Sequence, residues 1–123
     1  MGAPAVGEVP VQVFGRRDSR QTQRAQRFFR ERRIPLSFVD LAVRPIAPTE
    51  LRRFAQRLGV EALIDRDGRR YRDLGLGYQR MDDAEILERL LADPGLLRLP
   101  LVRRGEACVV GADEAAWKAL LAR

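Results

Sequence analysis

Residues 9–40 read VPVQVFGRRDSRQTQRAQRFFRERRIPLSFVD, and this stretch decides the class of fold. Apolar residues alternate with other residues at positions 9, 11 and 13, which is the period of a strand. A break follows, and the spacing then predicts a helix over 20–33 and a second strand over 36–40. Because a strand–helix–strand crossover is right-handed, the two strands are expected to be parallel.

The helix expected at 20–33 has two distinct faces. Asp18 or Ser19 is placed to cap its first turn, because short polar side chains accept hydrogen bonds from unpaired amides there. Three apolar residues recur at helical spacing on the inward stripe: Ala25, Phe28 and Phe29. Three arginines lie on the exposed side and form a candidate partner surface: Arg20, Arg24 and Arg27.

The middle of the chain is predicted to be helical. A loop punctuated by prolines leads to a helix that Thr49 is expected to cap and Gly59 to end. Further along, Asp82 and Glu85 resemble the capping box of another helix. These elements form a helical insert between the first strands and the rest of the sheet.

The last third is predicted to be a hairpin followed by a helix. Strand-like runs at 99–103 and 107–111 are separated by the turn Arg104-Gly105-Glu106. The closing helix turns Trp117 inward. The complete order is therefore βαβ, a helical insert, then ββα, which is an α/β fold.

Composition narrows the class of protein. The 123 residues suit one domain, 1–123, and 46% apolar residues are enough to form a core. We expect residues 1–8 to be flexible. No apolar run approaches the roughly 18 residues of a membrane span, and the first residues lack the pattern of a secretory signal. A cytoplasmic protein without membrane contact is predicted.

Two residue types that usually carry catalysis are scarce. The chain has no histidine, which removes the usual general base near pH 7 and the commonest transition-metal ligand. Its one cysteine, Cys108, excludes an internal disulfide and a zinc site built on thiolates. Apolar residues flank Cys108 on a predicted strand, so we expect a small core residue there. We predict no metal and no cofactor.

The positive charge is concentrated in one segment. The formal net charge is +6, and residues 16–33 hold eight arginines against two acidic residues, so the remainder sums to zero. This pattern indicates either a solvated helix face or a surface for an acidic partner or an anion. Nucleic-acid binding is disfavoured, because no aromatic residues interleave with the exposed arginines. An anion would bind at the helix start, among Arg16, Arg17, Ser19 and Arg20.

Four stretches carry a resemblance to a known family. They are Val13-Phe14-Gly15, Tyr71 to Leu76, Asp93 to Pro100, and Val110 to Trp117. In this order the chain resembles the ArsC family of arsenate reductase-like proteins, which includes the regulator Spx. The resemblance covers nearly the whole chain and implies a thioredoxin-like α/β fold with a mixed four-stranded sheet. It also implies that Pro100 is a cis-proline facing the active site.

The resemblance places a serine where the family keeps its catalytic residue. ArsC-like proteins have a cysteine at the start of the first helix, where the helix dipole stabilises the thiolate. Ser19 occupies that position, and Thr22 occupies the position of the second cysteine of Spx. The positions of the oxyanion-binding arginines fall on Asp65, on Leu99 and near Gly111. The resemblance therefore predicts that the redox site is missing.

A serine does not replace that thiol. Its hydroxyl is far less acidic, needs a neighbouring base, and cannot form the mixed disulfide of glutaredoxin-type recycling. We therefore expect a non-catalytic protein that binds an acidic protein partner through its arginine-rich first helix. Spx binds RNA polymerase, so a regulatory partner of that kind is one hypothesis. The alternatives are an arsenate reductase-like, glutathione/glutaredoxin-dependent oxidoreductase and an anion-binding pseudoenzyme.

Overall fold

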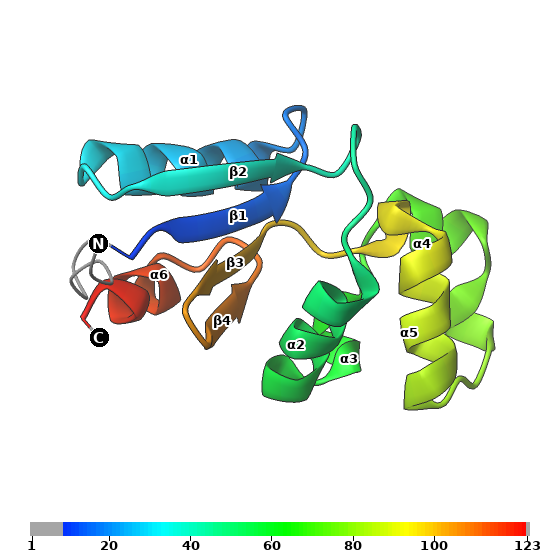
Figure 1. Ribbon diagram of the computed structural model, residues 1–123. Coiled ribbons are helices and arrows are strands. Elements are labelled where there is room, and N and C mark those ends of the chain that lie inside the picture. The colour runs from blue at the N-terminus through cyan, green and yellow to red at the C-terminus, as the bar shows by residue number, and fades with distance from the viewer. Residues whose placement is uncertain (1–8, 123) are drawn as a thin grey trace. The chain divides into compact units, whose positions relative to one another are not determined.

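Strands and helices follow one another in the order that the sequence predicts (Figure 1). The computed structural model describes residues 9–122, which fall into two compact units. One unit takes the chain up to Arg44 and again from Leu99, and the other is Pro45–Arg98. The expected flexibility of residues 1–8 lies outside the described residues, and a single domain over 1–123 stays a prediction.

The first unit is built on a four-stranded sheet in the order β2-β1-β3-β4. Its strands are β1 Val11–Gly15, β2 Leu36–Asp40, β3 Leu101–Arg104 and β4 Ala107–Val110. β1 and β2 run parallel, whereas β3 is antiparallel to both β1 and β4. The predictions of a parallel first pair and of a mixed four-stranded sheet are confirmed.

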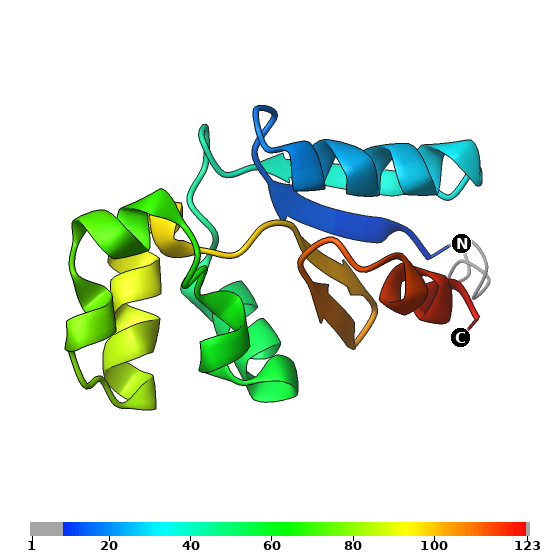
Figure 2. The ribbon, with the colours of Figure 1, turned by 180° about the vertical axis from the view of Figure 1, so that it is seen from behind.

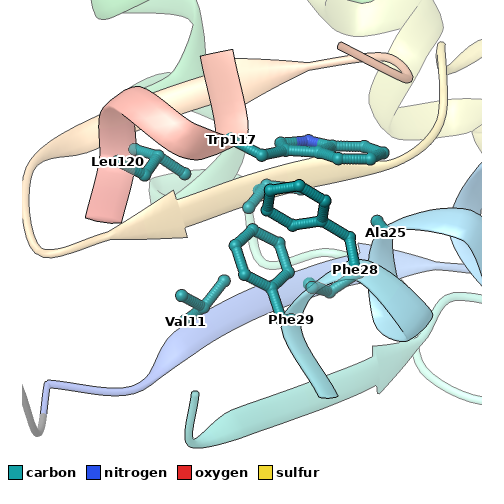
Figure 3. Close-up of a cluster of buried hydrophobic side chains, with 8 residues drawn as sticks. Val11, Ala25, Phe28, Phe29, Trp117 and Leu120 are labelled. Carbon is teal, nitrogen blue, oxygen red and sulfur yellow. The ribbon is translucent and has the colours of Figure 1, made fainter. Parts of the chain in front are cut away.

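Two helices, α1 Arg20–Glu31 and α6 Glu114–Leu121, pack on the sheet through one apolar cluster (Figures 1 and 2). Phe28 and Phe29 of α1 meet edge-on, with ring centroids 5.1 Å apart, and Trp117 of α6 lies 5.3 Å from Phe28 (Figure 3). Strand residues and the remaining helix residues complete the cluster: Val11, Val13, Ala25, Val102 and Leu120. The predicted inward stripe of α1 is confirmed.

Arg104 departs from the prediction for the hairpin. The sequence places it in the turn, but it ends β3 and is 92% buried, with only 8% of its surface exposed. Its guanidinium donates to the carbonyls of Val9 and Leu120, each at 3.2 Å. The turn falls instead on Gly105, whose φ of +60° lies in the left-handed region that glycine adopts without strain.

The second unit is helical, which confirms the predicted insert. Its elements are α2 Pro48–Leu58, α3 Val60–Leu63, α4 Arg69–Asp73, η2 Leu76–Tyr78, α5 Asp83–Ala92 and η3 Pro94–Leu96. None of the helices in residues 9–122 combines the length and the apolar character that a bilayer-spanning segment requires.

The helix starts of this unit test two predictions. Asp82 and Glu85 form the predicted capping box, because the Asp82 carboxylate accepts from the Glu85 amide at 2.8 Å and the Glu85 side chain accepts from the Asp82 amide. The expected cap at Thr49 is wrong, since α2 begins one residue earlier, at Pro48. Proline suits the first helical position because its φ is already helical and that position needs no donor.

Candidate functional site

The loop between β1 and α1 passes very close to the first turn of the helix. Gly15 ends β1, and a Cβ added there would lie 2.3 Å from Thr22 Oγ1 and 2.5 Å from Thr22 Cγ2. Thr22 is fully buried, and its Oγ1 accepts a long hydrogen bond, 3.4 Å, from the Arg16 amide. Glycine is needed here for the close approach of the two segments. Thr22 is therefore a packing residue of this loop.

Ser19 is the N-cap of α1. Its Oγ accepts a hydrogen bond from the Thr22 amide at 3.2 Å, and its backbone has the extended conformation of a cap residue. The same hydroxyl donates to Gln21 Oε1 at 3.4 Å. Of the two caps that the sequence allows, Ser19 is confirmed, while Asp18 bonds to a different residue. The hydroxyl thus serves the start of the helix, and within residues 9–122 its hydrogen bonds are to the Thr22 amide and the Gln21 side chain, neither of which is a general base.

Two of the three guanidinium groups of the candidate anion site, those of Arg16 and Arg17, are already paired. Arg16 binds Asp18 through two hydrogen bonds of 3.1 and 3.2 Å. Arg17 binds Asp40 at 3.2 Å, and its guanidinium carbon lies 5.9 Å from the centre of the Phe38 ring. Exposed pairs of this kind contribute only about 0–1 kcal/mol each. They nevertheless place two carboxylates beside the arginines, which weakens the local attraction for an anion.

Pro100 lies at the same end of the sheet as this loop. Leu101 is paired with Phe14, so the residue before it stands where β1 ends and the loop begins. The Leu99–Pro100 peptide bond is cis, which is the isomer that the resemblance implies. The Pro100 carbonyl accepts a hydrogen bond from the Gly111 amide at 2.9 Å. The sheet register therefore gathers Pro100 and Gly111 at the end where α1 starts, whereas Asp65 belongs to the other unit.

Cys108 lies away from the start of α1. It is on β4, where Ala107 and Val109 pack against the cluster under the helices, so Cys108 points to the opposite face of the sheet. Gly111 is three residues further along, about 10 Å at the rise of an extended chain. The expectation of a buried core residue is wrong, because Cys108 is only half-buried at an outer strand of the sheet.

The outward face of α1 carries the candidate partner surface. Arg20, Arg24 and Arg27 are all exposed, as predicted. Arg24 forms an ion pair with Glu114 of α6, with Nη2 3.2 Å from the Glu114 Oε1. In the described part of the chain, no carboxylate lies within ion-pair distance of Arg20 or Arg27. These two guanidinium groups are therefore the available charges of this face.

The sequence analysis did not predict the acidic partners of Arg17 and Arg24, which are Asp40 and Glu114. Asp40 ends β2 and is paired with Gly15 across the parallel sheet, which brings its carboxylate to the loop that holds Arg17. The predicted parallel pairing contained that signal, because the carboxyl ends of parallel neighbours lie at one edge. Glu114 is 90 residues from Arg24 in the sequence, and nothing local connects the two.

The sheet, the two helices packed on it and the cis-proline at its end define a thioredoxin-like α/β protein. Within this class, the sequence pattern of the ArsC family matches residues 16–120 of the chain. The chain belongs to the ArsC family. No curated protein matches the chain in sequence.

Solved structures of related proteins share this fold. The YFFB (PA3664) protein superimposes with a TM-score of 0.84 and 24% identity, over 90% of this chain and 98% of that one. Arsenate reductase from Vibrio cholerae gives a TM-score of 0.78 and 18% identity, over 89% and 97%. An arsenate reductase (ArsC) related protein from Brucella melitensis gives 0.69 and 24%, over 92% and 95%. At these identities the likeness establishes the arsenate reductase-like fold and no more.

Proposed function

We propose that this chain is a non-catalytic member of the ArsC family that binds an acidic surface of a protein partner through the outward face of α1. One observation carries the proposal. Ser19, at the position that the family resemblance gives to the catalytic cysteine, caps the helix through the Thr22 amide. What remains exposed beyond it is a row of arginines: Arg20, Arg24 and Arg27.

The chemistry of the loop argues against turnover. A serine nucleophile needs a base, and the nearest carboxylate in sequence, Asp18, is held by two hydrogen bonds from Arg16. Cys108 lies on β4, whereas Ser19 follows β1, and Cys108 faces away from α1. A thiol there lacks the amide donors and the helix dipole that stabilise a thiolate at a helix start. An arsenate reductase-like activity is therefore the less supported alternative.

The exposed face of α1 has the features of a rigid basic surface. The helix is anchored by two buried phenylalanines, so its arginines project from a fixed backbone. The guanidinium group binds carboxylates through two parallel hydrogen bonds, which favours an acidic protein surface. A positive field of this kind also speeds the encounter with an acidic partner. RNA polymerase, the partner of the related regulator Spx, is our first candidate, and we place the complex in the cytoplasm.

The test is binding to purified RNA polymerase from the organism that carries this chain, measured by biolayer interferometry. We expect R20E/R27E to weaken binding at least about tenfold, because each lost charge pair contributes up to about 1 kcal/mol and reversal adds repulsion. The matched control is R52E/R98E, which makes the same change of charge at two exposed arginines of the other unit. Equal losses of affinity in both variants would mean that the polymerase responds to the net charge of the chain and not to a defined surface on α1, which would refute the proposal.

Two further arms separate the alternatives. Purified wild-type protein is given arsenate with glutathione and glutaredoxin, and turnover that disappears in S19A would establish an enzyme and refute the proposal. Phosphate, sulfate or arsenate is also titrated during thermal unfolding. A rise in Tm at millimolar anion that is lost in R16A/R17A would favour the anion-binding alternative.

A further inference from the structure

The outer edge of β2 is free of any strand in the described part of the chain. β2 is the first strand in the sheet order and is paired only with β1 (Figures 1 and 2). An unpaired edge presents a row of main-chain donors and acceptors that another extended chain can use. β2 and β4 are the two end strands of the sheet, and β2 is the one that runs beside the arginine-rich segment, so its edge is a place where the sheet can accept a further strand.

The hydrogen-bond register shows which residues face this edge. The Pro35 carbonyl accepts from the Val11 amide at 2.9 Å, and the Leu41 amide donates to the Gly15 carbonyl at 2.8 Å. Main-chain groups alternate sides along a strand of a parallel pair. The amides and carbonyls of Leu36 and Phe38 consequently point away from β1.

Asp40 is the third residue of β2 whose main-chain groups point away from β1, and it is the last one on this edge. The Asp40 carbonyl already accepts hydrogen bonds from the amides of Val43 and Arg44, at 3.0 and 2.9 Å. These bonds form the turn after β2 and leave only the Asp40 amide for a partner. The usable edge is thus Leu36 to Asp40, long enough for a strand of about four or five residues.

A hollow lined by both apolar and charged side chains lies at the end of this edge. Its volume is about 310 Å³, and its lining residues are Arg17, Phe38, Val39, Asp40, Val43 and Arg44. Phe38 and Val39 are successive strand residues that point to opposite faces, so a hollow lined by both wraps around the edge. Val43 has 82% of its surface exposed, which is unusual for a large apolar side chain. The hollow can receive one apolar side chain of an added strand.

Arginines flank both ends of the edge. Arg33 lies three residues before β2 and is exposed, and Arg44 lies four residues after it and is also exposed. Arg17 adds a third charge at the far end, where it is balanced by Asp40. A second copy of this chain would bring the same arginines against their counterparts and be repelled. An acidic strand would be attracted at both ends.

We propose that the β2 edge binds an extended acidic segment of a partner protein by strand addition, with one apolar side chain of that segment in the hollow beside Val43. Main-chain hydrogen bonds from Leu36 and Phe38 supply the pairing, and Arg33 and Arg44 select for acidic residues at its ends. This surface is separate from the row Arg20, Arg24 and Arg27, so the two proposals can fail independently.

The experiment uses the full chain and a fluorescein-labelled octapeptide of alternating glutamate and valine, with binding followed by fluorescence anisotropy. We expect saturable binding that weakens about tenfold in R33E/R44E. The matched control R52E/R98E makes the same change of charge at two exposed arginines of the other unit and should retain binding within about threefold. V43S tests the hollow without touching the core, and several-fold weaker binding is expected.

Amide hydrogen exchange locates the peptide. At a peptide concentration ten times the Kd, exchange at Leu36 and Phe38 should slow about tenfold. Unchanged exchange there, or a loss of binding in R52E/R98E but not in R33E/R44E, would place the peptide elsewhere and overturn the edge site. A second octapeptide, of alternating lysine and valine, is the control for charge. Equal binding of that peptide, or no saturable binding of the glutamate–valine peptide up to millimolar concentration, would overturn the choice of an acidic strand. Protection that depends on protein concentration without peptide would instead identify a second copy.

Discussion

The substitution S19A removes one hydrogen bond at the start of α1. In the native chain, Ser19 Oγ accepts from the Thr22 amide at 3.2 Å, and Thr22 itself is fully buried. Alanine keeps the backbone but leaves this donor without its partner. If the hydroxyl serves the helix as a cap, the loss will appear as lower stability, whatever the activity of the protein.

The magnitude follows from the burial of that amide. Replacing a serine cap by alanine costs about 1 kcal/mol, within a range of about 0.5–2 kcal/mol. The unpaired amide belongs to Thr22, which is fully buried, so water has little access to it. We therefore expect S19A to lower the free energy of unfolding by about 1–2 kcal/mol and Tm by roughly 3–8 °C. S19D should restore the stability to within about 0.5 kcal/mol of wild type, because aspartate caps as well as serine. The first turn of α1 contains no acidic residue, so a carboxylate there also meets a favourable helix dipole.

The assay is urea unfolding followed by tryptophan fluorescence. Trp117 is the only tryptophan, is fully buried and lies against Phe28 and Phe29 of α1, so its signal reports on the unit that contains Ser19. S37A is the matched control, since Ser37 is the other serine of the chain and is exposed on β2. It should change the free energy of unfolding by less than about 0.5 kcal/mol.

Either of two results would contradict the role of Ser19 as a helix cap. S19A as stable as S37A would mean that the hydroxyl contributes nothing as a cap. S19D less stable than S19A would mean that this position does not accept a carboxylate as a helix cap. In either case Ser19 would again be open to a role in binding or chemistry.

Three other substitutions test the packing around the site and the second unit. G15A should cost about 2–3 kcal/mol, because its Cβ would overlap Thr22, and T22A should relieve part of that cost in a double-mutant cycle by urea unfolding. D82A should lose about 1 kcal/mol with its capping box, measured by circular dichroism. F29A should cost about 3–5 kcal/mol in chemical unfolding because Phe29 is fully buried, whereas Y78A, at a residue 97% exposed, should stay within about 0.5 kcal/mol. A small effect of F29A or a large one of Y78A would contradict the assigned core.

Local patterns predicted the elements because the signals for helices and turns lie within a few residues. The spacing of Ala25, Phe28 and Phe29 identified the buried stripe of α1, and Ser19 and Asp82 identified two of the helix starts. Each of these features depends on hydrogen bonds or contacts that span three or four residues. Such contacts form in any fold that contains the helix, so they can be predicted without the tertiary structure.

The wrong predictions concern residues whose environment is set from far away. Arg104 sits beside a turn signal, yet it is buried because the carbonyls of Val9 and Leu120 accept from its guanidinium. Cys108 has apolar neighbours in sequence, but β4 ends the sheet order and turns it to the face opposite α1. Which face of a strand is covered depends on where the helices pack, and the strand's own residues do not carry that information.

The sequence alone determined the order of elements, the net charge of +6, the absence of histidine and the serine at position 19. Only the tertiary structure decided which arginines stay available, because Arg17 and Arg24 are paired with carboxylates 23 and 90 residues away. It likewise left β2 at the edge of the sheet. The physical reason is the same in both cases: charge and main-chain pairing act through space, and the sheet register and helix packing set which groups meet.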